Sequence, residues 1–239
     1  MGLNGKRVVI LGGSSGIGLA VAQAVAGEGA QVVIASSNSD RLDRALSSLP
    51  PGSEGRVANL LSSGEVAALL AELGDFDHLV YTAGEALQIA PLKEMDISAA
   101  RSFFELRYWG AVAAAKAAQG RLRPGGSIVF TSGVAGARPG GGWSVAASIC
   151  SAMEGLTRAL AVELAPIRVN IVSPGVVRTA LWREMDEPTR EALYASEAAR
   201  LPVGHVAEAS EIAEGYLYLM RQTYATGQVL ALDGGGLLV

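Results

Sequence analysis

A glycine-rich segment near the start of the chain has the residue types and the spacing of a phosphate-binding loop. It follows an apolar run at 7–11 that is typical of a strand, and it opens an Ala-rich stretch typical of a helix. Glycine lets backbone N–H groups approach a pyrophosphate closely, and a helix N-terminus directs further N–H groups at the same charge. The pattern predicts a dinucleotide site. The expected contacts come from Gly12, Ser14, Ser15, Gly16, Ile17 and Gly18.

The residues after the second apolar run, at 31–36, bear on which dinucleotide fits. NAD-binding sites of this kind usually carry an acidic residue there, which accepts hydrogen bonds from the ribose hydroxyls. This chain has Ser36, Ser37 and Asn38 instead, with Arg41 three residues further on. Hydroxyl, amide and guanidinium donors suit a 2′-phosphate. We therefore expect NADP(H) rather than NAD(H); the alternative is a polar turn followed by a solvated arginine.

The elements that must position these residues alternate regularly along the chain. Short β-branched runs are separated by longer Ala- and Leu-rich segments, which indicates an α/β fold with a doubly wound (Rossmann), seven-stranded parallel sheet and helices on both faces. The near-continuous apolar runs favour strands that are covered on both sides. Strands are predicted at 7–11, 31–36, 56–60, 78–82, 127–132, 168–173 and 228–232.

Helices are predicted between these strands, and two of them have marked starts. Ser62 and Glu65 have the spacing of a capping box, and Pro188 follows two acids where an extra helix at 186–200 would begin. We expect one domain over 1–239, with a short substrate-side insertion around 180–205 and a flexible loop at 136–142. The other helices are predicted at 16–28, 63–73, 98–119, 147–164 and 208–221.

Composition narrows the classes of function. Of the 239 residues, 50% are apolar and 18% are charged, and the net charge of −4 includes no basic run of the kind that nucleic-acid binding needs. No stretch resembles an export signal or a membrane span, and the single Cys150 cannot form an internal disulfide. We expect a cytoplasmic protein with a small-molecule substrate, no nucleic-acid or membrane partner and no metal site.

Several segments together resemble the short-chain dehydrogenase/reductase family. They are the G-x-x-x-G-x-G spacing at 12–18, EGLTRALAVELAPIRVN at 154–170, RVNIVSPGVVRT at 168–179 and TGQVLALDGG at 226–235. The resemblance covers nearly the whole chain, although Tyr81 and Thr82 replace the asparagines of the family's Asn-Asn-Ala-Gly motif. It implies further cofactor contacts from Asn59, Leu60, Ala83, Gly84, Thr131, Pro174, Gly175, Val177 and Thr179.

The resemblance also implies where catalytic residues should stand, and all four positions have changed. Active relatives use a Tyr as general acid, a Lys four residues later, a Ser and an Asn. Aligned on the flanking segments, these fall on Ala146, Cys150, Gly133 and Arg107. The chain is therefore expected to be an atypical member that lacks the Asn-Ser-Tyr-Lys tetrad.

Two side chains are candidate replacements, and each has a plainer interpretation. Arg107 could clamp an anion or stabilise an oxyanion, but an arginine on a helix is more often paired or solvated. Ser132 could turn its hydroxyl into the site, but strand alternation places it on the face opposite position 133. Cys150 has no neighbouring His in the sequence and is more often inert packing than a nucleophile.

Three functions remain open at this point. One is an atypical NADP(H)-dependent oxidoreductase that acts on an unknown activated carbonyl, quinone or enone. Another is a non-catalytic NADP(H)-binding sensor or partner subunit, and the third is a scaffold without cofactor, which the glycine loop at 12–18 disfavours. The resemblance further implies a homo-oligomer, a tetramer or a dimer, assembled through the helices at 98–119 and 147–164.

Overall fold

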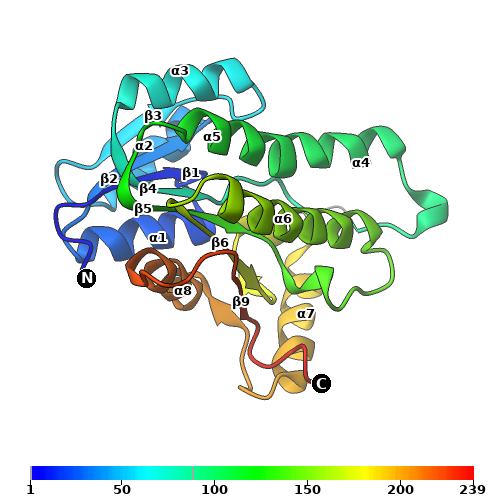
Figure 1. Ribbon diagram of the computed structural model, residues 1–239. Helices are drawn as coiled ribbons and strands as arrows, with labels where there is room; N and C mark the ends of the chain where they lie inside the picture. The colour runs from blue at the N-terminus through cyan, green and yellow to red at the C-terminus, as the bar shows by residue number, and fades with distance from the viewer. Residues whose placement is uncertain (1, 88) are drawn as a thin grey trace.

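A computed structural model describes residues 2–87 and 89–239 as a doubly wound α/β fold. Seven strands pair in parallel in the order β3-β2-β1-β4-β5-β6-β9, which confirms the predicted sheet (Figure 1). Positions 1 and 88 of the expected domain lie outside the described residues. The strands are β1 (Arg7–Leu11), β2 (Gln31–Ser36), β3 (Glu54–Val57), β4 (Phe76–Tyr81), β5 (Leu122–Thr131), β6 (Arg168–Pro174) and β9 (Val229–Leu232).

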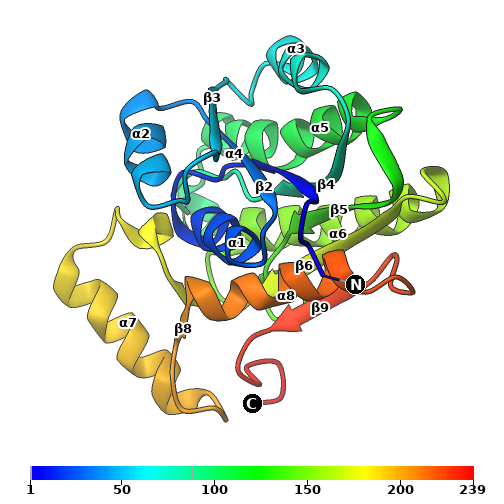
Figure 2. The ribbon, with the colours of Figure 1, turned by 90° about the vertical axis from the view of Figure 1, so that its left-hand side faces the viewer.

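Helices cover both faces of this sheet, and Figure 1 shows the two layers. One layer contains α3 (Ser63–Leu73), α4 (Ile97–Phe104), α5 (Gly110–Ala118) and α6 (Ser144–Glu163), and the other contains α1 (Gly16–Gly27), α2 (Ser39–Ser47) and α8 (Ala209–Arg221). The helix α7 (Glu187–Arg200) stands away from the sheet beside the C-terminal tail (Figure 2).

The central strands explain why the sheet needs two layers of helices. In β1, Val9 and Leu11 pack with α3, α5 and α6, while Val8 and Ile10 pack with α1 and α8. None of these four side chains is exposed. Because side chains alternate between the faces of a strand, a continuous apolar run buries surface on both sides.

The long helix predicted at 98–119 is interrupted in the structure. A π-helical turn, Glu105–Trp109, separates α4 from α5. Within it the carbonyl oxygen of Leu106 accepts a hydrogen bond of 2.6 Å from the Tyr81 hydroxyl. Such turns insert one extra residue and redirect the side chains that follow, and they are frequent at functional sites. This one carries Arg107.

Three smaller differences from the predicted elements concern β3, α2 and the start of α3. The strand predicted at 56–60 is β3, which ends at Val57, and the helix α2 was not predicted. At the start of α3, Ser62 accepts from the Glu65 N–H as predicted, but the Glu65 carboxylate accepts from the backbone N–H of Asn59 at 2.9 Å. The predicted capping box is therefore only half formed.

Among the described residues, one helix is long and apolar enough to cross a membrane by length and composition alone. It is α6, whose most apolar window has a mean hydropathy of 1.3. Here one side of α6 packs on the sheet through Ile149 and Met153, and the helix also carries charged residues such as Arg158.

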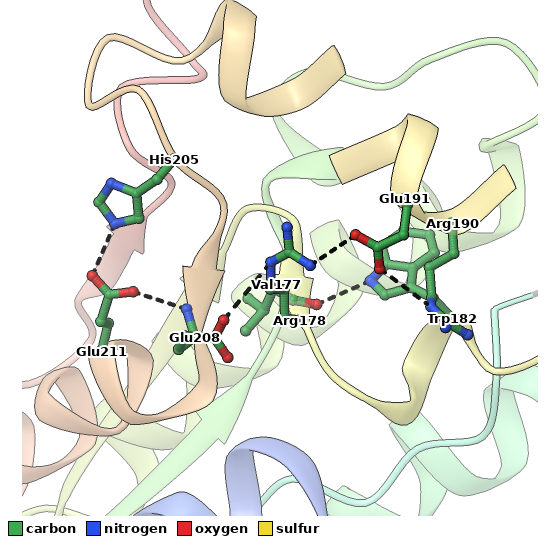
Figure 3. Close-up of polar contacts among 8 residues, drawn as sticks. All are labelled: Val177, Arg178, Trp182, Arg190, Glu191, His205, Glu208 and Glu211. Atoms are coloured by element: carbon green, nitrogen blue, oxygen red, sulfur yellow. Dashed lines mark hydrogen bonds and ion pairs between the residues drawn. The ribbon is translucent and has the colours of Figure 1, made fainter. Parts of the chain in front are cut away.

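The segment expected as a substrate-side insertion is held to a separate two-stranded sheet, β7 (Val177–Arg178) and β8 (Ala207–Glu208), by a small polar and aromatic cluster. The helix predicted at 186–200 is α7, which begins after Asp186, and the Asp186 side chain accepts from the Thr189 N–H. In Figure 3, Arg178 lies between α7 and the start of α8, where it pairs with Glu191 at 3.2 Å and with Glu208 at 3.7 Å. Its guanidinium also lies 4.3 Å from the ring centroid of Tyr194.

Candidate functional site

A cleft of about 350 Å³ opens at the carboxyl ends of β1 and β4. These two strands are neighbours, and the chain crosses to opposite sides of β1 when it forms β2 and β4, so the strand order reverses there. Ligands of doubly wound sheets bind at such a switch point. The cleft runs from Ser36 and Arg41 at one end to Arg107 and Ser132 at the other.

The glycine loop packs too closely against β4 for any larger residue. A Cβ at Gly12 would lie 2.5 Å from the backbone N of Ala83, and one at Gly18 would collide with the Gly12 carbonyl oxygen and the Thr82 hydroxyl. Gly12 also has a φ of +94°, which only glycine adopts readily. The loop therefore leaves a backbone-lined cradle open toward the cleft.

The N-terminus of α1 completes this cradle. Its first helical residue, Gly16, follows Ser15, which has extended backbone angles and makes no side-chain capping bond. The first turn contains no acidic residue. Uncapped N–H groups and the positive end of the helix dipole favour an anion at this position, so the residues present fit a pyrophosphate.

The end of the cleft near β2 is rich in donors. The Ser14 hydroxyl lies 2.9 Å from that of Ser36, and Ser37 and Arg41 line the same wall. Neither Ser37 nor Arg41 has a side-chain hydrogen bond or ion pair to another described residue. Asn38 does not line the cleft: its side chain accepts from the Arg41 N–H at 2.8 Å and caps α2.

The opposite end of the cleft begins at the carboxyl end of β5. Thr131 and Ser132 line it, and the Ser132 hydroxyl donates to Glu154 of α6 at 3.2 Å. Ser132 thus lines the cleft with its hydroxyl directed at Glu154. Gly133 does not line the cleft, and a Cβ there would lie 3.3 Å from the sulfur of Cys150.

Arg107 enters the same end of the cleft from the π-helical turn. Its Nη2 donates to the backbone oxygen of Glu85, and its Nε lies 3.6 Å from the Glu85 carboxylate. The guanidinium carbon is 5.0 Å from the centroid of the Phe103 ring. Only 22% of the Arg107 side chain is exposed, so it is not solvated. It is paired with Glu85, which is the other of the two plainer interpretations.

Burial is the largest cause of the pKa shifts of Glu85 and Cys150 at this end of the cleft. It raises the pKa of the Glu85 carboxyl, although the positive charge of Arg107 opposes the rise. It also raises the pKa of the Cys150 thiol, again against Arg107. Cys150 is therefore a neutral thiol at neutral pH, which agrees with inert packing better than with a nucleophile.

Most of the predicted cofactor contacts line one cleft, but three lie elsewhere. Asn38 caps α2, Gly175 lines a separate cavity of about 280 Å³ near the C-terminal tail, and Val177 is buried with its carbonyl accepting from Trp182. The predicted residues that line the cleft are Gly12, Ser14, Ser15, Gly16, Ile17, Gly18, Ser36, Ser37, Arg41, Asn59, Leu60, Ala83, Gly84, Thr131, Pro174 and Thr179.

Asn59 lies in the cleft wall, with its side chain already engaged. The side-chain oxygen accepts from the Leu61 N–H at 3.1 Å, so the expected contact between that oxygen and an adenine amino group has a competitor. Its amide NH₂ remains available as a donor.

Several residues of the cleft were not predicted. Thr82 ends the strand predicted at 78–82, and Glu85 lies three residues further on. Because the carboxyl ends of parallel strands meet at one edge, these positions were a usable signal. The others come from turns whose contacts depend on the assembled fold. The unpredicted lining residues are Leu61, Thr82, Glu85, Leu106, Ala180, Leu181 and Arg183.

Comparison with known proteins identifies the family. Residues 12–236 match the family model described as enoyl-(acyl carrier protein) reductase. The chain is 34% identical to the short-chain dehydrogenase/reductase malC of Malbranchea aurantiaca, over 99% of this chain and 96% of that protein. It is 37% identical to ATR9 of Stachybotrys chlorohalonatus, a protein of the same description, over 99% and 98%.

Solved structures agree with the sequence relatives. The MalC reductase/Diels-Alderase superposes with a TM-score of 0.92 at 33% identity, covering 99% of this chain and 98% of that one. A small-chain dehydrogenase in complex with NADPH superposes with a TM-score of 0.85 at 34% identity, covering 99% and 100%. With its sheet order, its glycine cradle and these matches, the chain belongs to the short-chain dehydrogenase/reductase family.

Proposed function

We propose that this protein is an atypical NADP(H)-dependent reductase that acts on an activated acceptor such as a quinone or a conjugated enone. The observation that carries the proposal is the single cleft that joins the glycine cradle to a polar end at Arg107 and Ser132. One end of this cleft suits two phosphates and the other suits a reacting group. A protein that served only as an assembly scaffold would need neither the phosphate-binding end nor the end that suits a reacting group.

The donors beside β2 support NADP(H) as the preferred dinucleotide. Ser36 and Ser37 end the strand where NAD sites usually have an acid, and Arg41 supplies a cation to the same wall. A small-chain dehydrogenase with 34% identity to this chain was solved with NADPH. A 2′-phosphate there would gain charge-assisted hydrogen bonds, whereas ribose hydroxyls would meet no carboxylate.

The side chains at the expected catalytic positions favour an acceptor that tolerates slow protonation. Ala146 is buried and Gly133 has no side chain, so neither supplies a phenol or a hydroxyl. Cys150 supplies no charge. A positioned general acid is typically worth about 10²–10⁴ in rate, whereas orientation of donor and acceptor contributes independently. Quinones and enones give delocalised anions on reduction, so they depend less on that acid than simple ketones do.

The residues present would divide the work between binding and orientation. When bound, the dinucleotide supplies a hydride. The α1 N-terminus and the loop at Gly12 would hold its pyrophosphate, while Arg107 would orient the acceptor at the opposite end of the cleft.

Calorimetry with the two coenzymes tests the first half of the proposal. We expect NADPH to bind at least about tenfold more tightly than NADH, and Arg41→Ala to reduce that preference because it removes a charge-assisted contact. Lack of affinity for both coenzymes would overturn the proposal. An Arg44→Ala variant, on the same helix but outside the cleft lining, is the matched control.

Transfer of deuterium from the coenzyme tests the second half of the proposal, the reduction of an activated acceptor. The protein is incubated with NADPH deuterated on the transferred position and a panel of quinones, enones and ketones, and product deuterium is measured by mass spectrometry. We expect enzyme-dependent deuterium in quinone or enone products. Tight NADPH binding without any transfer would instead support the non-catalytic binder, a sensor or partner subunit.

A second candidate function is a ring-forming step within the same cleft. It is favoured by the 0.92 TM-score to a protein described as a reductase/Diels-Alderase, together with an acceptor end that has no phenol–ammonium couple. A cycloaddition needs shape and orientation rather than proton transfer. The test is the enantiomeric excess of the cycloadduct from a substrate that carries a diene and an alkene, with protein and in buffer. Racemic product in both removes this candidate.

We also propose a homo-oligomer assembled through the outer faces of α4, α5 and α6. Trp109, in the π-helical turn between α4 and α5, and Val162 of α6 are 54% and 80% exposed, and we expect the oligomer interface to cover them. Light scattering on the purified chain measures the mass directly, and Val162→Arg should shift it toward the monomer.

A further inference from the structure

The acceptor end of the cleft contains two polar atoms with unmet hydrogen-bonding capacity. The Nε of Arg107 and the Oε2 of Glu85 are both buried, and neither has a hydrogen-bond partner among the described residues. They lie 3.6 Å apart, just too far for a hydrogen bond. Both side chains line the cleft. Buried polar groups are nearly always satisfied, so an unmet donor and acceptor side by side indicate a ligand that completes them.

The positions of both side chains are set by the backbone rather than by each other. The Arg107 guanidinium packs under Gly84 and donates to the Glu85 backbone oxygen, while Glu85 directly follows the turn that ends β4. A surface arginine and glutamate that met only as an ion pair would close to a bidentate contact. Here the guanidinium donates to the backbone oxygen of Glu85, and the two side chains make a long ion pair of 3.6 Å instead of a bidentate contact.

We propose that Glu85 is the proton donor of this cleft and that Arg107 receives the negative charge that develops on the oxygen of a conjugated carbonyl substrate. This inference rests on the proposed reductase function, whose acceptor it narrows to an enone-like compound. It gives the chain an acid on the β4 side of the cleft in place of the absent phenol on α6.

The chemistry balances with groups that are named here. The double bond of the acceptor gains a hydride, supplied by the reduced dinucleotide, at the carbon remote from the carbonyl. The π electrons move to the carbonyl oxygen, whose charge is met by the N–H groups of Arg107. The carbon next to the carbonyl then takes the proton of the Glu85 carboxyl, which leaves a saturated ketone and a carboxylate. Water returns a proton to Glu85, and the dinucleotide leaves oxidised.

The surroundings of Glu85 shift the pKa of its carboxyl upward. Burial raises its pKa above the ordinary 4.5, and Arg107, the cation that faces it from the π-helical turn, opposes that rise. The Tyr81 phenol faces it from β4, and burial raises the pKa of that phenol too, so it stays neutral. The Cys150 thiol meets the guanidinium from α6 and also stays neutral.

Ser132 is the competing donor at this end, and the structure argues against it. Its hydroxyl already donates to the Glu154 carboxylate at 3.2 Å, so its proton points away from an acceptor in the cleft. Ser132→Ala therefore serves as a contrast to Glu85→Gln rather than as a second proposal.

The first experiment measures the pH dependence of enone reduction with NADPH. We expect Glu85→Gln to lower the rate by about 100-fold, since a general acid typically contributes 10²–10⁴. In the parent protein the rate falls as the pH rises through the pKa of Glu85, because only the protonated form donates, and this falling limb disappears in Glu85→Gln. A glutamine variant with the parent rate and the parent pH profile would overturn the inference. Glu214→Gln, an exposed carboxylate on α8, is the matched control.

The second experiment does not depend on turnover. The probe is 4-nitrophenol, whose phenolate band reports binding of an oxyanion to the complex with NADP⁺. We expect Arg107→Gln to weaken phenolate binding by at least about tenfold, because the charged donor is lost. Unchanged phenolate binding in Arg107→Gln would overturn the inference even if no acceptor in the panel is reduced.

Measurements of coenzyme binding distinguish failure of the proposed function from failure of the assignment of Glu85 and Arg107. If the parent protein binds neither NADPH nor NADP⁺ in calorimetry, the proposed function fails. If both bind normally to the parent, Glu85→Gln and Arg107→Gln proteins while the pH limb and the phenolate band are unchanged, only the assignment of Glu85 and Arg107 fails.

Discussion

Arg107 lies directly against the backbone of Gly84. A Cβ built on Gly84 would stand 2.7 Å from the guanidinium carbon of Arg107, which is closer than carbon atoms approach one another. The guanidinium therefore occupies the space that any other residue at position 84 would claim. The turn after β4 and the π-helical turn before α5 are thereby fitted to each other, although they are more than 20 residues apart in the sequence.

Gly84→Ala should displace the guanidinium without unfolding the chain. The obstructing atoms belong to the end of a flexible side chain, so the protein can relax at a cost of about 1 kcal/mol or less. We expect binding of 4-nitrophenolate to the NADP⁺ complex to weaken by about tenfold, because Arg107 leaves the carboxyl end of β4. Optical titration measures the affinity, and urea denaturation measures the stability. Parent-like phenolate affinity in the alanine variant would contradict this prediction.

Two glycines of α1 should respond oppositely to alanine. At Gly18 a Cβ meets the Gly12 carbonyl oxygen and the Thr82 hydroxyl, and backbone cannot move aside cheaply. We expect Gly18→Ala to cost about 1–3 kcal/mol and to weaken NADPH binding by at least about tenfold.

Gly27→Ala is the matched control for Gly18→Ala. Nothing lies within 4 Å of a Cβ at Gly27, the last residue of the helix, so alanine should be neutral or stabilise by about 0.5 kcal/mol. Equal calorimetric affinities for NADPH in the two variants would show that the glycine cradle does not hold the dinucleotide.

The sheet and the glycine loop were predictable from the sequence because they depend on short-range patterns. The apolar run at 7–11 is long enough for one strand, and Gly12 and Gly18 follow it at a fixed spacing. By contrast, the direction of Arg107 depends on the π-helical turn, which is secured by the Tyr81 hydroxyl reaching Leu106 across 25 positions. A pattern of helical period through 98–119 contains no sign of that turn.

The missed helix α2 has a different cause. It is nine residues long and mostly polar, with Leu42 and Ala45 as its buried residues, so its apolar face is too short to stand out. Because α2 is not evident from the sequence, the capping role of Asn38 is not evident either. The sequence predicts a contact between Asn38 and the dinucleotide, whereas in the structure Asn38 caps the helix that brings Arg41 to the cleft.

Arg178→Ala should loosen α7 more than the rest of the molecule. Arg178 stacks on Tyr194 and pairs with Glu191, but its side chain is 40% exposed, so we expect a loss of only about 1 kcal/mol in total. Hydrogen exchange followed by mass spectrometry should become faster in 187–200. Arg190→Ala, whose ion pair stays within α7, is the control. A uniform change across the chain would mean that the cluster in Figure 3 does not anchor this helix.

His78 should make stability depend on pH in the mildly acidic range. The His78 side chain is 4% exposed and lies beside Ser127. Burial lowers the pKa of His78 from 6.5 to about 4. The negative charge of Asp77 opposes this lowering, and the positive charge of Arg168 adds to it. Between those values the unfolded chain binds a proton that the folded chain does not. The free energy of unfolding should therefore rise by about 3 kcal/mol from pH 4 to pH 6.5. Above pH 6.5, His78 should add nothing further to it.

Urea denaturation at a series of pH values checks the role of His78. His78→Gln should be less stable overall but should lack this rise. His205→Gln is the control, because the contact with Glu211 raises the pKa of the exposed His205 and gives a dependence of the opposite sign. A steep rise that persists in His78→Gln would assign it to other groups.

Cys150→Lys, which places a lysine where the resemblance predicts the family's lysine, should be tolerated only if Arg107 is removed at the same time. Cys150→Lys alone places an ammonium beside a buried guanidinium, and the two like charges should destabilise the fold by about 2 kcal/mol or more. Arg107→Asn combined with Cys150→Lys keeps one cation at this end, now on α6. We expect the double variant to be more stable than the sum of the single changes predicts, by at least about 1 kcal/mol.

Adding Ala146→Tyr and Gly133→Ser to that pair tests whether the cleft still holds ketone and coenzyme productively. The new phenol would regain a cationic neighbour that lowers its pKa, so reduction of simple ketones should rise by about 100-fold or more. The same set with Arg107 retained should gain much less, because repulsion from the guanidinium displaces the lysine. If neither set gains activity while both bind NADPH as the parent does, then the acceptor end has been reshaped beyond these four positions.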